Sequence, residues 1–574
     1  MNELLLWISG TVIAIVALRR AYNRLLLSRA KHPSLQGHAR LGKRLARLLP
    51  FYEYDEKRFF DSDGAPHAVV SQRKAGFDRL ADALESRAAK TIGASAALES
   101  GISDVQFTKR YRVPFQYSRY VAQRLRVGSL LQSSSGVTVT NLDGHVDYEL
   151  TGSYGVNLFG NDFYKSCIDA GIDLVRSLGP QLGAYHPVIL DNVRWLKEIS
   201  GMDEVSFHMS GTEAVMQAVR LARFHTSRSH VVRFCGAYHG WWDDVQPGVG
   251  NPATVRTTYT LKDMDDATLR VLATRRDIAC VLVNPLQALH PNSVAPADGT
   301  LVDSSRRATF DRDAYAEWLE TLRAVCSRRS IVLIFDEIFV GFRIARGGAQ
   351  EYFNVRADLV TYGKTVGGGL PIGVVCGKAR YMKRFREDRP SDVCFARGTF
   401  NSHPYVMGAM HEFLRRLNEP ELRRAYDGLS ETWDARARGL NQRLEAEDLP
   451  VRVVNLISIW TVCYTRPSRY NWMFQYYLRA EGLALSWIGT GRLIFSHNYA
   501  DADVAAVCDR LVAAARAMRD DGWWWHSPAL TNRAIKRLIL RETIAELVRQ
   551  PFRRSPQAAV SSRTIGSNNS PRTT

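Results

Sequence analysis

A lysine and an aspartate follow two apolar segments of this chain, and together they could carry out chemistry on an aldehyde. Lys364 comes after "DLVTYG" (358–363) and before three glycines, and Asp336 comes after "IVLIF" (331–335). An unprotonated lysine in a crevice can form a Schiff base with an aldehyde. A carboxylate at the end of a buried strand is costly unless a positive charge meets it, so Asp336 either caps a helix or faces a cationic ligand atom. Taken alone, the lysine and its glycines would equally suit a surface turn.

A third segment, "SGTEAVMQAVRLAR" (210–223), has the features of a helix that begins directly after a strand. Ser210 and Glu213 have the spacing of a capping box. The helix would begin at Gly211 and Thr212, whose free backbone N–H groups could bind a phosphate group; an ordinary capped helix is the alternative. The residues expected on its buried face recur at helical spacing and are Val215, Ala218, Val219 and Ala222.

An aromatic side chain lies at a fourth point, after the apolar segment "HVVRF" (230–234). Tyr238 and His239 stand between Gly236 and Gly240, which predicts a tight turn. On such a turn the tyrosine ring could stack on a flat ligand, or it could pack in the core. A phosphate site, an aromatic ring, a carboxylate and a lysine in one crevice together describe a site for pyridoxal 5′-phosphate.

The elements that would position these four groups alternate along residues 160–400, where short apolar segments are separated by helical patterns. Fully apolar segments of this kind predict a parallel sheet that is covered on both faces. In such sheets, sites form where strands end and helices begin. An Asp143-Gly144 turn within 137–150 predicts a separate hairpin. The segments expected as strands of the main sheet are 205–209, 230–234, 279–283, 331–335, 358–363 and 372–377.

With these residues in place, the chain resembles the class III, fold-type I pyridoxal-phosphate aminotransferases, and most of all the glutamate-1-semialdehyde aminomutase-like group. The resemblance covers about residues 135–515. It implies an α/β fold with a large, mainly parallel-sheet domain at 135–404 and a smaller α+β domain at 405–525. The segments that carry it are "SGTEAVMQAVRLAR" (210–223), "GAYHGWWDD" (236–244), "IFDEIFVGFR" (334–343), "YGKTVGGGLPIG" (362–373) and "RGTFNSHP" (397–404).

The resemblance also implies a role for each site residue. Lys364 would be the Schiff-base lysine, and Asp336 would pair with the pyridinium nitrogen. Tyr238 would stack on the ring and Ile338 would pack on its other face. Thr399 would reach the phosphate of a neighbouring subunit, which implies a homodimer with shared sites. The catalytic residues expected are Lys364 and Asp336, and the cofactor-binding residues are Ser210, Gly211, Thr212, Tyr238, His239, Asp336, Ile338, Lys364 and Thr399.

Three positions depart from the pattern of many relatives. Asn284-Pro285 stands where many have Glu-Pro, and Leu289 stands where relatives that use glutamate have a gating glutamate. Phe339 replaces a glutamine that many aminotransferases have. These changes put the usual glutamate/2-oxoglutarate pair in doubt and indicate a more apolar site.

The totals limit the remaining possibilities. A chain of 574 residues is too long for one ordinary core. Its eight cysteines are scattered without a C-x-x-C pair, which argues against disulfides and zinc and suits a reducing compartment. The net charge of +18 is concentrated at the ends, with nine Lys/Arg and no acid within 19–47. Because no nucleic-acid motif accompanies these charges, we expect anionic lipid as the partner, and no nucleic acid.

The N-terminus carries the apolar run "LLLWISGTVIAIVAL" (4–18), followed directly by arginines. This order predicts a membrane anchor within residues 1–30 with the catalytic body in the cytoplasm; an interfacial helix, a signal peptide and a buried helix are the alternatives. Residues 31–134 would form a mostly helical juxtamembrane extension. Residues 526–574 would form a basic amphipathic helix, which either contacts the membrane or packs on the body, and a disordered tail.

These features predict a membrane-tethered aminotransferase that moves an amino group onto an aldehyde or ketone, and we expect a large apolar acceptor. An aminomutase, which shifts an amine within one molecule, is the main alternative. A non-catalytic membrane scaffold would not need Lys364 and Asp336. A nucleic-acid-binding regulator with this fold is a further alternative. The sequence names neither the amino donor nor the acceptor, and it predicts no metal.

Overall fold

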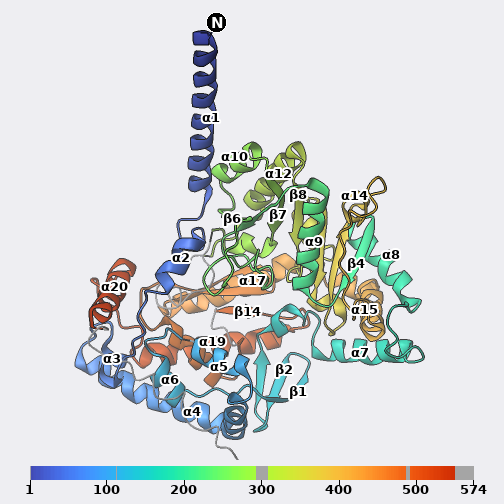
Figure 1. The fold of residues 1–574 in the computed structure, drawn as a ribbon. Coiled ribbons are helices and arrows are strands. Elements are labelled where there is room, and N and C mark those ends of the chain that lie inside the picture. Colours follow the sequence, from blue (N-terminus) through green and yellow to red (C-terminus); the bar gives the residue numbers. More distant parts are fainter. Residues whose placement is uncertain (1, 112, 293–307, 487–490, 550–574) are drawn as a thin grey trace, which may run out of the picture.

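The computed structural model describes residues 2–111, 113–292, 308–486 and 491–549, and the side chains of residues 2–6 and 109–111 lie outside this description. Its centre is a seven-stranded sheet with the order β4-β10-β9-β8-β7-β5-β6 (Figure 1). The strands are β4 (Glu204–His208), β5 (His230–Phe234), β6 (Thr258–Leu261), β7 (Ile278–Val283), β8 (Val332–Asp336), β9 (Leu359–Gly363) and β10 (Gly373–Gly377).

Six of these strands run in the same direction, and β10 runs opposite to both of its neighbours, β4 and β9. The predicted mainly parallel sheet is therefore confirmed, but β10, which was expected as one of its parallel strands, is antiparallel. The reason is the connection from β9 to β10, residues 364–372, which is too short for the crossover helix that a parallel neighbour needs. The sequence analysis also missed β6, whose "TYTL" is not a continuous apolar run.

Helices cover both faces of the sheet, as the apolar strands predict. Alternate strand residues divide between two apolar clusters, one of which includes α9 (Gly211–Thr226) and the other α8 (Val188–Ser200) and α12 (Arg312–Arg329). Helix α9 lies across β4, β7, β8, β9 and β10. Its predicted inner face is confirmed, since the following residues are all fully buried: Val215, Ala218, Val219 and Ala222.

Two smaller sheets complete the catalytic body. The predicted hairpin around Asp143-Gly144 is confirmed as β2 (Thr138–Asn141) paired with β3 (Val146–Glu149). It joins β1 (Leu131–Ser135) and β13 (Leu483–Ala484) in a four-stranded sheet. The second sheet contains β11 (Val451–Leu456), β12 (Ile459–Tyr464) and β14 (Arg492–Ile494), with α17 (Leu429–Ala446) against β11 and α19 (Asp501–Asp520) against α17.

The N-terminal extension packs against the smaller part of the body, which contains the β11-β12-β14 sheet and α19 (Figure 1). Its helices are α2 (Ala39–Ala46), α3 (Glu56–Asp61), α4 (His67–Glu99), α5 (Ser103–Tyr111) and α6 (Ser118–Arg124). Phe59 and Phe77 contact Trp523 edge-on across the boundary. Arg73 forms a fully buried ion pair with Asp63 at 2.7 Å and donates to the carbonyl of Gly522. The extension is thus part of the folded body, not a flexible spacer.

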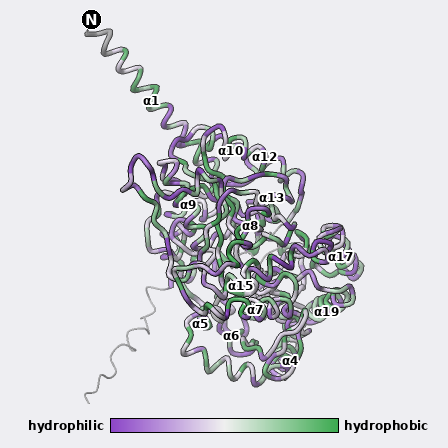
Figure 2. The backbone as a smooth tube through the Cα atoms, turned by 90° about the vertical axis from the view of Figure 1, so that its right-hand side faces the viewer, coloured by the Kyte–Doolittle hydropathy of each residue, from purple (hydrophilic) through white to green (hydrophobic). Residues whose placement is uncertain are grey.

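Helix α1 (Asn2–Ala30) leaves the body as an isolated rod (Figures 1 and 2). Its last turns are fixed, because Leu26 and Ala30 are buried and Lys262 N donates to the Ala30 carbonyl at 3.0 Å. Within the described residues, no helix is both long enough and apolar enough to cross a membrane, so the structure does not support the predicted spanning anchor. The first residues of the apolar run, Leu4–Leu6, lie outside the described side chains.

Candidate active site

Lys364 lies at the carboxyl end of β9 and is the first residue of a 3-10 turn, Lys364–Gly367. Its φ of +53° lies in the left-handed region, which is costly for a residue with a Cβ and is found where function demands it. The lysine Nζ donates a hydrogen bond to the carbonyl oxygen of Tyr154 at 2.5 Å. It also lies over the ring of Phe339, 4.5 Å from the centroid. The lysine head group is therefore held in one place by backbone and ring.

The surroundings of Lys364 favour its neutral form. The pKa of its amine falls from 10.5 to about 8, chiefly because burial desolvates the amine; Asp336 opposes this shift, and the positive charges of Arg343 and Arg492 add to it. The Lys364 residue is partly exposed. A larger share of its amine is therefore neutral at physiological pH than in an ordinary lysine, which favours attack on an aldehyde.

Asp336 ends β8 and is 3% exposed, as the sequence predicts for a carboxylate at a strand end. Its Oδ2 lies 2.7 Å from Nδ1 of His239, and its Oδ1 accepts from the backbone N–H of Ile338 at 3.2 Å. Burial lowers the pKa of His239, and the pull of Asp336 only partly opposes this. A neutral His239 donates to Asp336 and orients the carboxylate without adding a positive charge, which suits a partner for a pyridinium nitrogen.

The amino end of α9 lies next to the same strand ends. Ser210 accepts from Glu213 N at 3.3 Å, but the Glu213 side chain accepts from Met209 N, one residue before the position that a capping box predicts. The backbone here is closely packed: a Cβ on Gly211 would lie 2.7 Å from Ile338. A Cβ on Gly240, whose φ is +92°, would lie 2.5 Å from Thr212 Oγ1. These glycines leave room for a phosphate group at the helix end.

The two residues expected on either face of a flat ring differ in exposure. Ile338 follows Asp336 by two residues and lies against Gly211 and Gly363. Tyr238 is 62% exposed, so it is not a core residue. Its carbonyl accepts from Asn284 Nδ2 at 3.0 Å, which fixes the turn that carries the ring. The structure thus gives Asn284 a positioning role that the sequence analysis did not assign.

The turn that faces Lys364 was not predicted from the sequence. Ser153 and Tyr154 have φ values of +44° and +57°, an unusual pair for residues other than glycine. A Cβ on Gly155 would lie 2.7 Å from Phe339 and 3.2 Å from Lys364. The spacing of Gly152 and Gly155 around the pair was the available signal. Because Lys364 contacts a backbone oxygen here, no side chain marks the contact.

Arg343 joins the two parts of the body behind the site. The sequence assigned it no role. Its guanidinium donates to the carbonyls of Phe495 at 2.7 Å and Asn157 at 2.8 Å and to Ser458 Oγ at 3.1 Å. Desolvation lowers its pKa to about 10, so it remains charged at neutral pH. This charge is one reason why Lys364 loses its proton readily.

Two predicted positions lie apart from this cluster. Leu289 is fully buried at the end of the turn Pro285–Leu289 and packs in the core, so it acts as no gate. Thr399 is exposed, on the segment that precedes α15 (Pro404–Leu417). Its expected contact with a neighbouring subunit stays a prediction.

The matching family model is described as "Aminotransferase class-III" and covers residues 123–515. The chain belongs to this family. It is an enzyme of the pyridoxal-phosphate-dependent aminotransferase fold, as the sequence predicted. All eight cysteines are buried, and none is paired in a disulfide in the structure.

Similar proteins extend the family assignment. The chain is 30% identical to the glutamate-1-semialdehyde 2,1-aminomutase of Nitratidesulfovibrio vulgaris (strain DP4) over 392 residues, which cover 66% of this chain and 89% of that protein. It is 31% identical to the corresponding protein of Methanococcus maripaludis (strain C7), over 56% of this chain and 72% of that one. The structure is similar to a glutamate-1-semialdehyde aminomutase from Pseudomonas aeruginosa PAO1, with a TM-score of 0.62 at 19% identity, covering 78% and 99% of the two chains.

A solved structure described as a transaminase with PLP bound matches with a TM-score of 0.56 at 25% identity, over 68% of this chain and 92% of that one. Pyridoxal 5′-phosphate is the cofactor that the family and these neighbours support. The residues present fit it: an amine of lowered pKa at Lys364, a buried carboxylate at Asp336 that His239 orients, and a helix that begins at Gly211, where a Cβ would meet Ile338. Within the described part of the chain, no cluster of side chains could hold a metal ion.

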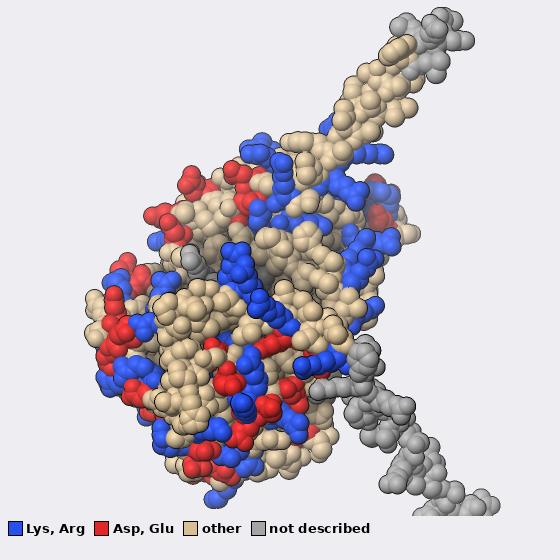
Figure 3. Space-filling view, turned by 90° about the vertical axis from the view of Figure 1, so that its left-hand side faces the viewer, with Lys and Arg blue, Asp and Glu red and all other residues tan. Residues whose placement is uncertain are grey.

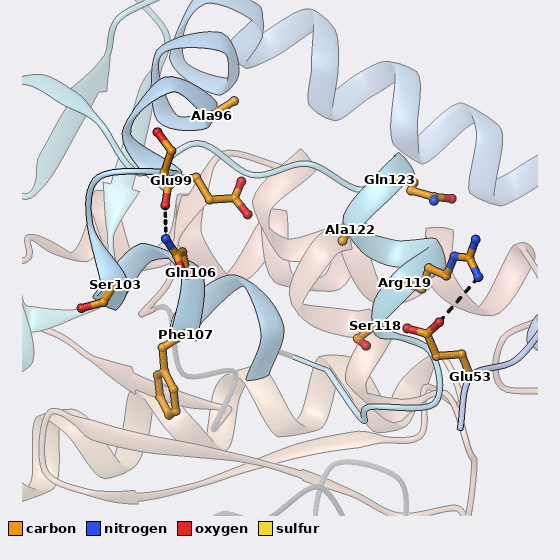
Figure 4. A pocket seen from close by; sticks show the side chains of 11 residues that line it. Glu53, Ala96, Glu99, Ser103, Gln106, Phe107, Ser118, Arg119, Ala122 and Gln123 are labelled. Carbon is orange, nitrogen blue, oxygen red and sulfur yellow. Dashed lines mark hydrogen bonds and ion pairs between the residues drawn. The ribbon is translucent and has the colours of Figure 1, made fainter. Parts of the chain in front are cut away.

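A separate hollow of about 900 Å³ lies between α4, α5 and α6 (Figure 4). Its wall includes an ion pair of Arg119 with Glu53 at 3.7 Å and a hydrogen bond from Gln106 to the Glu99 carbonyl at 2.7 Å. None of the residues that the sequence assigned to the cofactor site lines this hollow. It is an open feature of the N-terminal extension and distinct from the site at Lys364.

Proposed function

We propose that the protein is an aminotransferase that moves an amino group onto an aldehyde or ketone with a large apolar substituent. The observation that carries this proposal is Lys364, whose amine has a pKa of about 8 under the influence of the buried carboxylate of Asp336. A non-catalytic scaffold would have no need for this arrangement, which lowers stability by burying an amine and straining a backbone angle.

Each residue of the site has a task in this reaction. When bound, pyridoxal phosphate supplies an electron sink for the charge that develops on the substrate carbon. Asp336 holds the proton on the ring nitrogen, with His239 fixing the direction of the carboxylate. The Lys364 amine takes and returns the substrate proton, since its lowered pKa places it near neutral pH. Gly211 and Thr212 offer backbone N–H groups to the phosphate.

An aminomutase is the second candidate, and the relatives named glutamate-1-semialdehyde 2,1-aminomutase favour it. The two functions differ in whether an external amino donor is required. Phe339, beside the Lys364 amine, makes the site more apolar than a small acidic substrate would need. This position favours the aminotransferase with an apolar acceptor.

The active form proposed is a homodimer. Aromatic side chains on the segments that follow β5 and precede α15 are strongly exposed on a single chain, including Trp241 at 75%, Phe395 at 73% and Phe400 at 51%. Thr399 lies among them in the sequence. A second copy would cover these rings, since so many large apolar side chains seldom remain in water.

We also propose that the protein is attached to a membrane with its catalytic body in the cytoplasm. The supporting observation is α1, which projects with Trp7, Ile13 and Leu18 at least 68% exposed. Arg19 and Arg20 follow this apolar part and would lie at the lipid headgroups. Lipid would then also be a source of the acceptor.

Deleting residues 1–25 tests the attachment, because the deletion keeps the buried residues Leu26 and Ala30, which complete the fold. The truncated protein should no longer pellet with neutral vesicles.

A half-reaction screen tests the catalytic proposal. The purified enzyme with bound pyridoxal phosphate is mixed with single amine donors, and the absorbance of the covalently bound cofactor is followed. The form that results is then given long-chain aldehydes, ketones or soluble keto acids. Conversion of glutamate-1-semialdehyde with a higher kcat/KM than any long-chain carbonyl, and without a donor, would establish the aminomutase instead.

A further inference from the structure

Helix α20 (Asn532–Arg549) presents an unusual outer face, with basic and apolar side chains and no acidic ones. Arg533, Arg537 and Arg541 are exposed at helical spacing on its first half. The second half exposes the apolar residues Leu540 at 57%, Ile544 at 50%, Leu547 at 38% and Val548 at 64%.

Both acids of α20 face the body. Glu542 accepts from Arg58 at 2.6 Å, from Tyr54 at 2.5 Å and from Arg469 at 3.1 Å. Glu546 is 8% exposed. Arg469 is itself buried and donates to the carbonyl of Ser62 at 2.9 Å. These contacts fix the rotation of α20 about its axis. Its exposed apolar residues are therefore held on the outer side of the helix by the packing of the opposite side.

Helix α2 (Ala39–Ala46) and the residues after it show the same composition. Arg40, Arg44 and Arg47 are exposed, and no acid occurs between Arg19 and Tyr52. Leu41 is 52% exposed, whereas Gly42 is buried. The other exposed apolar residues of this segment are Leu45 at 40%, Leu48 at 63%, Leu49 at 61% and Phe51 at 49%. Lys43 is directed elsewhere, since it donates to the Ala253 carbonyl at 2.5 Å.

Although about 500 residues separate them in the sequence, α2 and α20 lie on the same side of the molecule, at the left of Figure 1, together with the base of α1. Figure 3 views this side and shows Lys and Arg side chains gathered below the base of α1. We call the outer faces of α2 with residues 47–51 and of α20 the basic-apolar face.

We infer that the basic-apolar face binds the surface of an anionic lipid bilayer. Charge complementarity supports this partner, because every charged side chain exposed on the two helices is positive. The interleaved leucine, isoleucine and valine side chains would enter the boundary between headgroups and acyl chains. A nucleic acid would satisfy the arginines but leave these apolar side chains in water. A protein partner would need acidic side chains spread among apolar ones.

This inference deepens the proposed membrane attachment, but it rests on helices that pack on the body and not on α1. It adds two expectations that α1 alone does not provide. Binding should depend on anionic lipid, and it should weaken as ionic strength rises, because salt screens surface charges. The truncation of residues 1–25 should leave this charge-dependent part of the binding in place.

The test is sedimentation of the full chain with vesicles of phosphatidylcholine, with or without a minority of phosphatidylserine. The full chain should bind the anionic vesicles about tenfold more tightly, and this preference should disappear at high ionic strength. Arg537→Glu with Arg541→Glu should reduce anionic-vesicle binding about tenfold. Leu540→Ser, Ile544→Ser and Val548→Ser together should reduce it by a similar factor while leaving binding to soluble polyanions such as RNA unchanged.

The matched control is Arg438→Glu with Arg452→Glu, which removes the same charges from exposed positions of the smaller part of the body. It should bind as the unmodified chain does, and circular dichroism should show all variants folded. Equal binding to neutral and anionic vesicles would overturn the inference while leaving the α1 attachment standing. An equal loss of vesicle binding in the control pair would also overturn it. So would a loss of RNA binding in the serine variants.

Discussion

The Oδ2 atom of Asp336 lies 2.7 Å from Nδ1 of His239, and both side chains are almost completely buried. Because burial lowers the pKa of His239, the imidazole is neutral at physiological pH and adds no positive charge beside the Asp336 carboxylate. The pair therefore presents one uncompensated buried carboxylate beside Lys364. Such a charge is costly without a cationic partner, and the ring nitrogen of pyridoxal phosphate is suited to be that partner.

Lys364→Ala should abolish turnover and the absorbance of covalently bound cofactor, because no other group at the end of β9 can make the bond. The variant should remain folded, since alanine keeps a Cβ and bears the same cost of the left-handed backbone angle as lysine, about 1–2 kcal/mol. Absorbance spectra and circular dichroism measure the two effects. Lys378→Ala is the control: Lys378 follows β10 in the same way, but it pairs with Asp358 at 3.1 Å and should be dispensable for the cofactor.

The pH dependence of cofactor capture follows from the Lys364 pKa. Only the neutral amine attacks the aldehyde, and this form becomes dominant as pH rises through about 8 instead of the ordinary 10.5. The rate at which cofactor-free enzyme captures pyridoxal phosphate should therefore rise with pH, with a midpoint near 8, and level off above it. Stopped-flow absorbance gives the profile. A midpoint near the ordinary value would show that Lys364 is not desolvated.

Asp336→Ala should slow proton abstraction about 100-fold or more, because it removes the preorganised charge that keeps the ring nitrogen protonated. Asp336→Glu should retain part of the rate. His239→Phe should have a smaller effect, since the carboxylate remains and only its orienting hydrogen bond is lost. Single-turnover kinetics with a donor amine measures all three. Normal turnover of Asp336→Ala would mean that another residue holds the nitrogen.

Gly240→Ala should weaken cofactor binding about tenfold or more, because its new Cβ would lie 2.5 Å from Thr212 Oγ1 and displace the phosphate site. Gly250→Ala is a closely matched control. Its φ of +90° resembles the +92° of Gly240, but its Cβ would meet nothing within 4 Å. The control therefore carries the same backbone strain without the clash. Equilibrium dialysis of pyridoxal phosphate should separate the two variants; equal affinities would remove Thr212 from the phosphate site.

Much of the site followed from the sequence because strand ends are marked by composition. Asp336 and Lys364 each follow a fully buried strand, and β8 and β9 are neighbours in the sheet, so a rule about strand ends was enough to bring them together. The same rule placed Ser210 and Gly211 after β4 and Tyr238 beyond β5.

The remaining contacts depend on chain geometry that residue types do not reveal. The reversed direction of β10 comes from the length of a connection, not from the strand itself. The Tyr154 contact uses a backbone oxygen on a turn with two positive φ angles. Arg343 contacts three residues that are distant in sequence, and only the folded chain brings them together.

The position of Phe339 provides a prediction about the acceptor. Its ring centroid lies 4.5 Å from the Lys364 Nζ, and a Cβ on Gly155 would lie 2.7 Å from the ring, so Phe339 occupies space next to the reactive amine. A phenyl ring there favours apolar substituents and leaves a carboxylate without a hydrogen-bond donor. Phe339→Gln should therefore lower kcat/KM for long-chain aldehydes relative to soluble keto acids by about tenfold.

Phe385→Gln is the matched control for this change, because Lys383 Nζ lies 5.0 Å from the centroid of that exposed ring, away from the site. It makes the same substitution beside a lysine and should leave the acceptor preference unaltered. Competition between a long-chain aldehyde and a keto acid, followed by mass spectrometry of the two amine products, measures the preference directly. If Phe339→Gln and Phe385→Gln give the same product ratio as the unmodified enzyme, the ring does not select the acceptor, and the apolar-acceptor proposal loses the residue on which it depends.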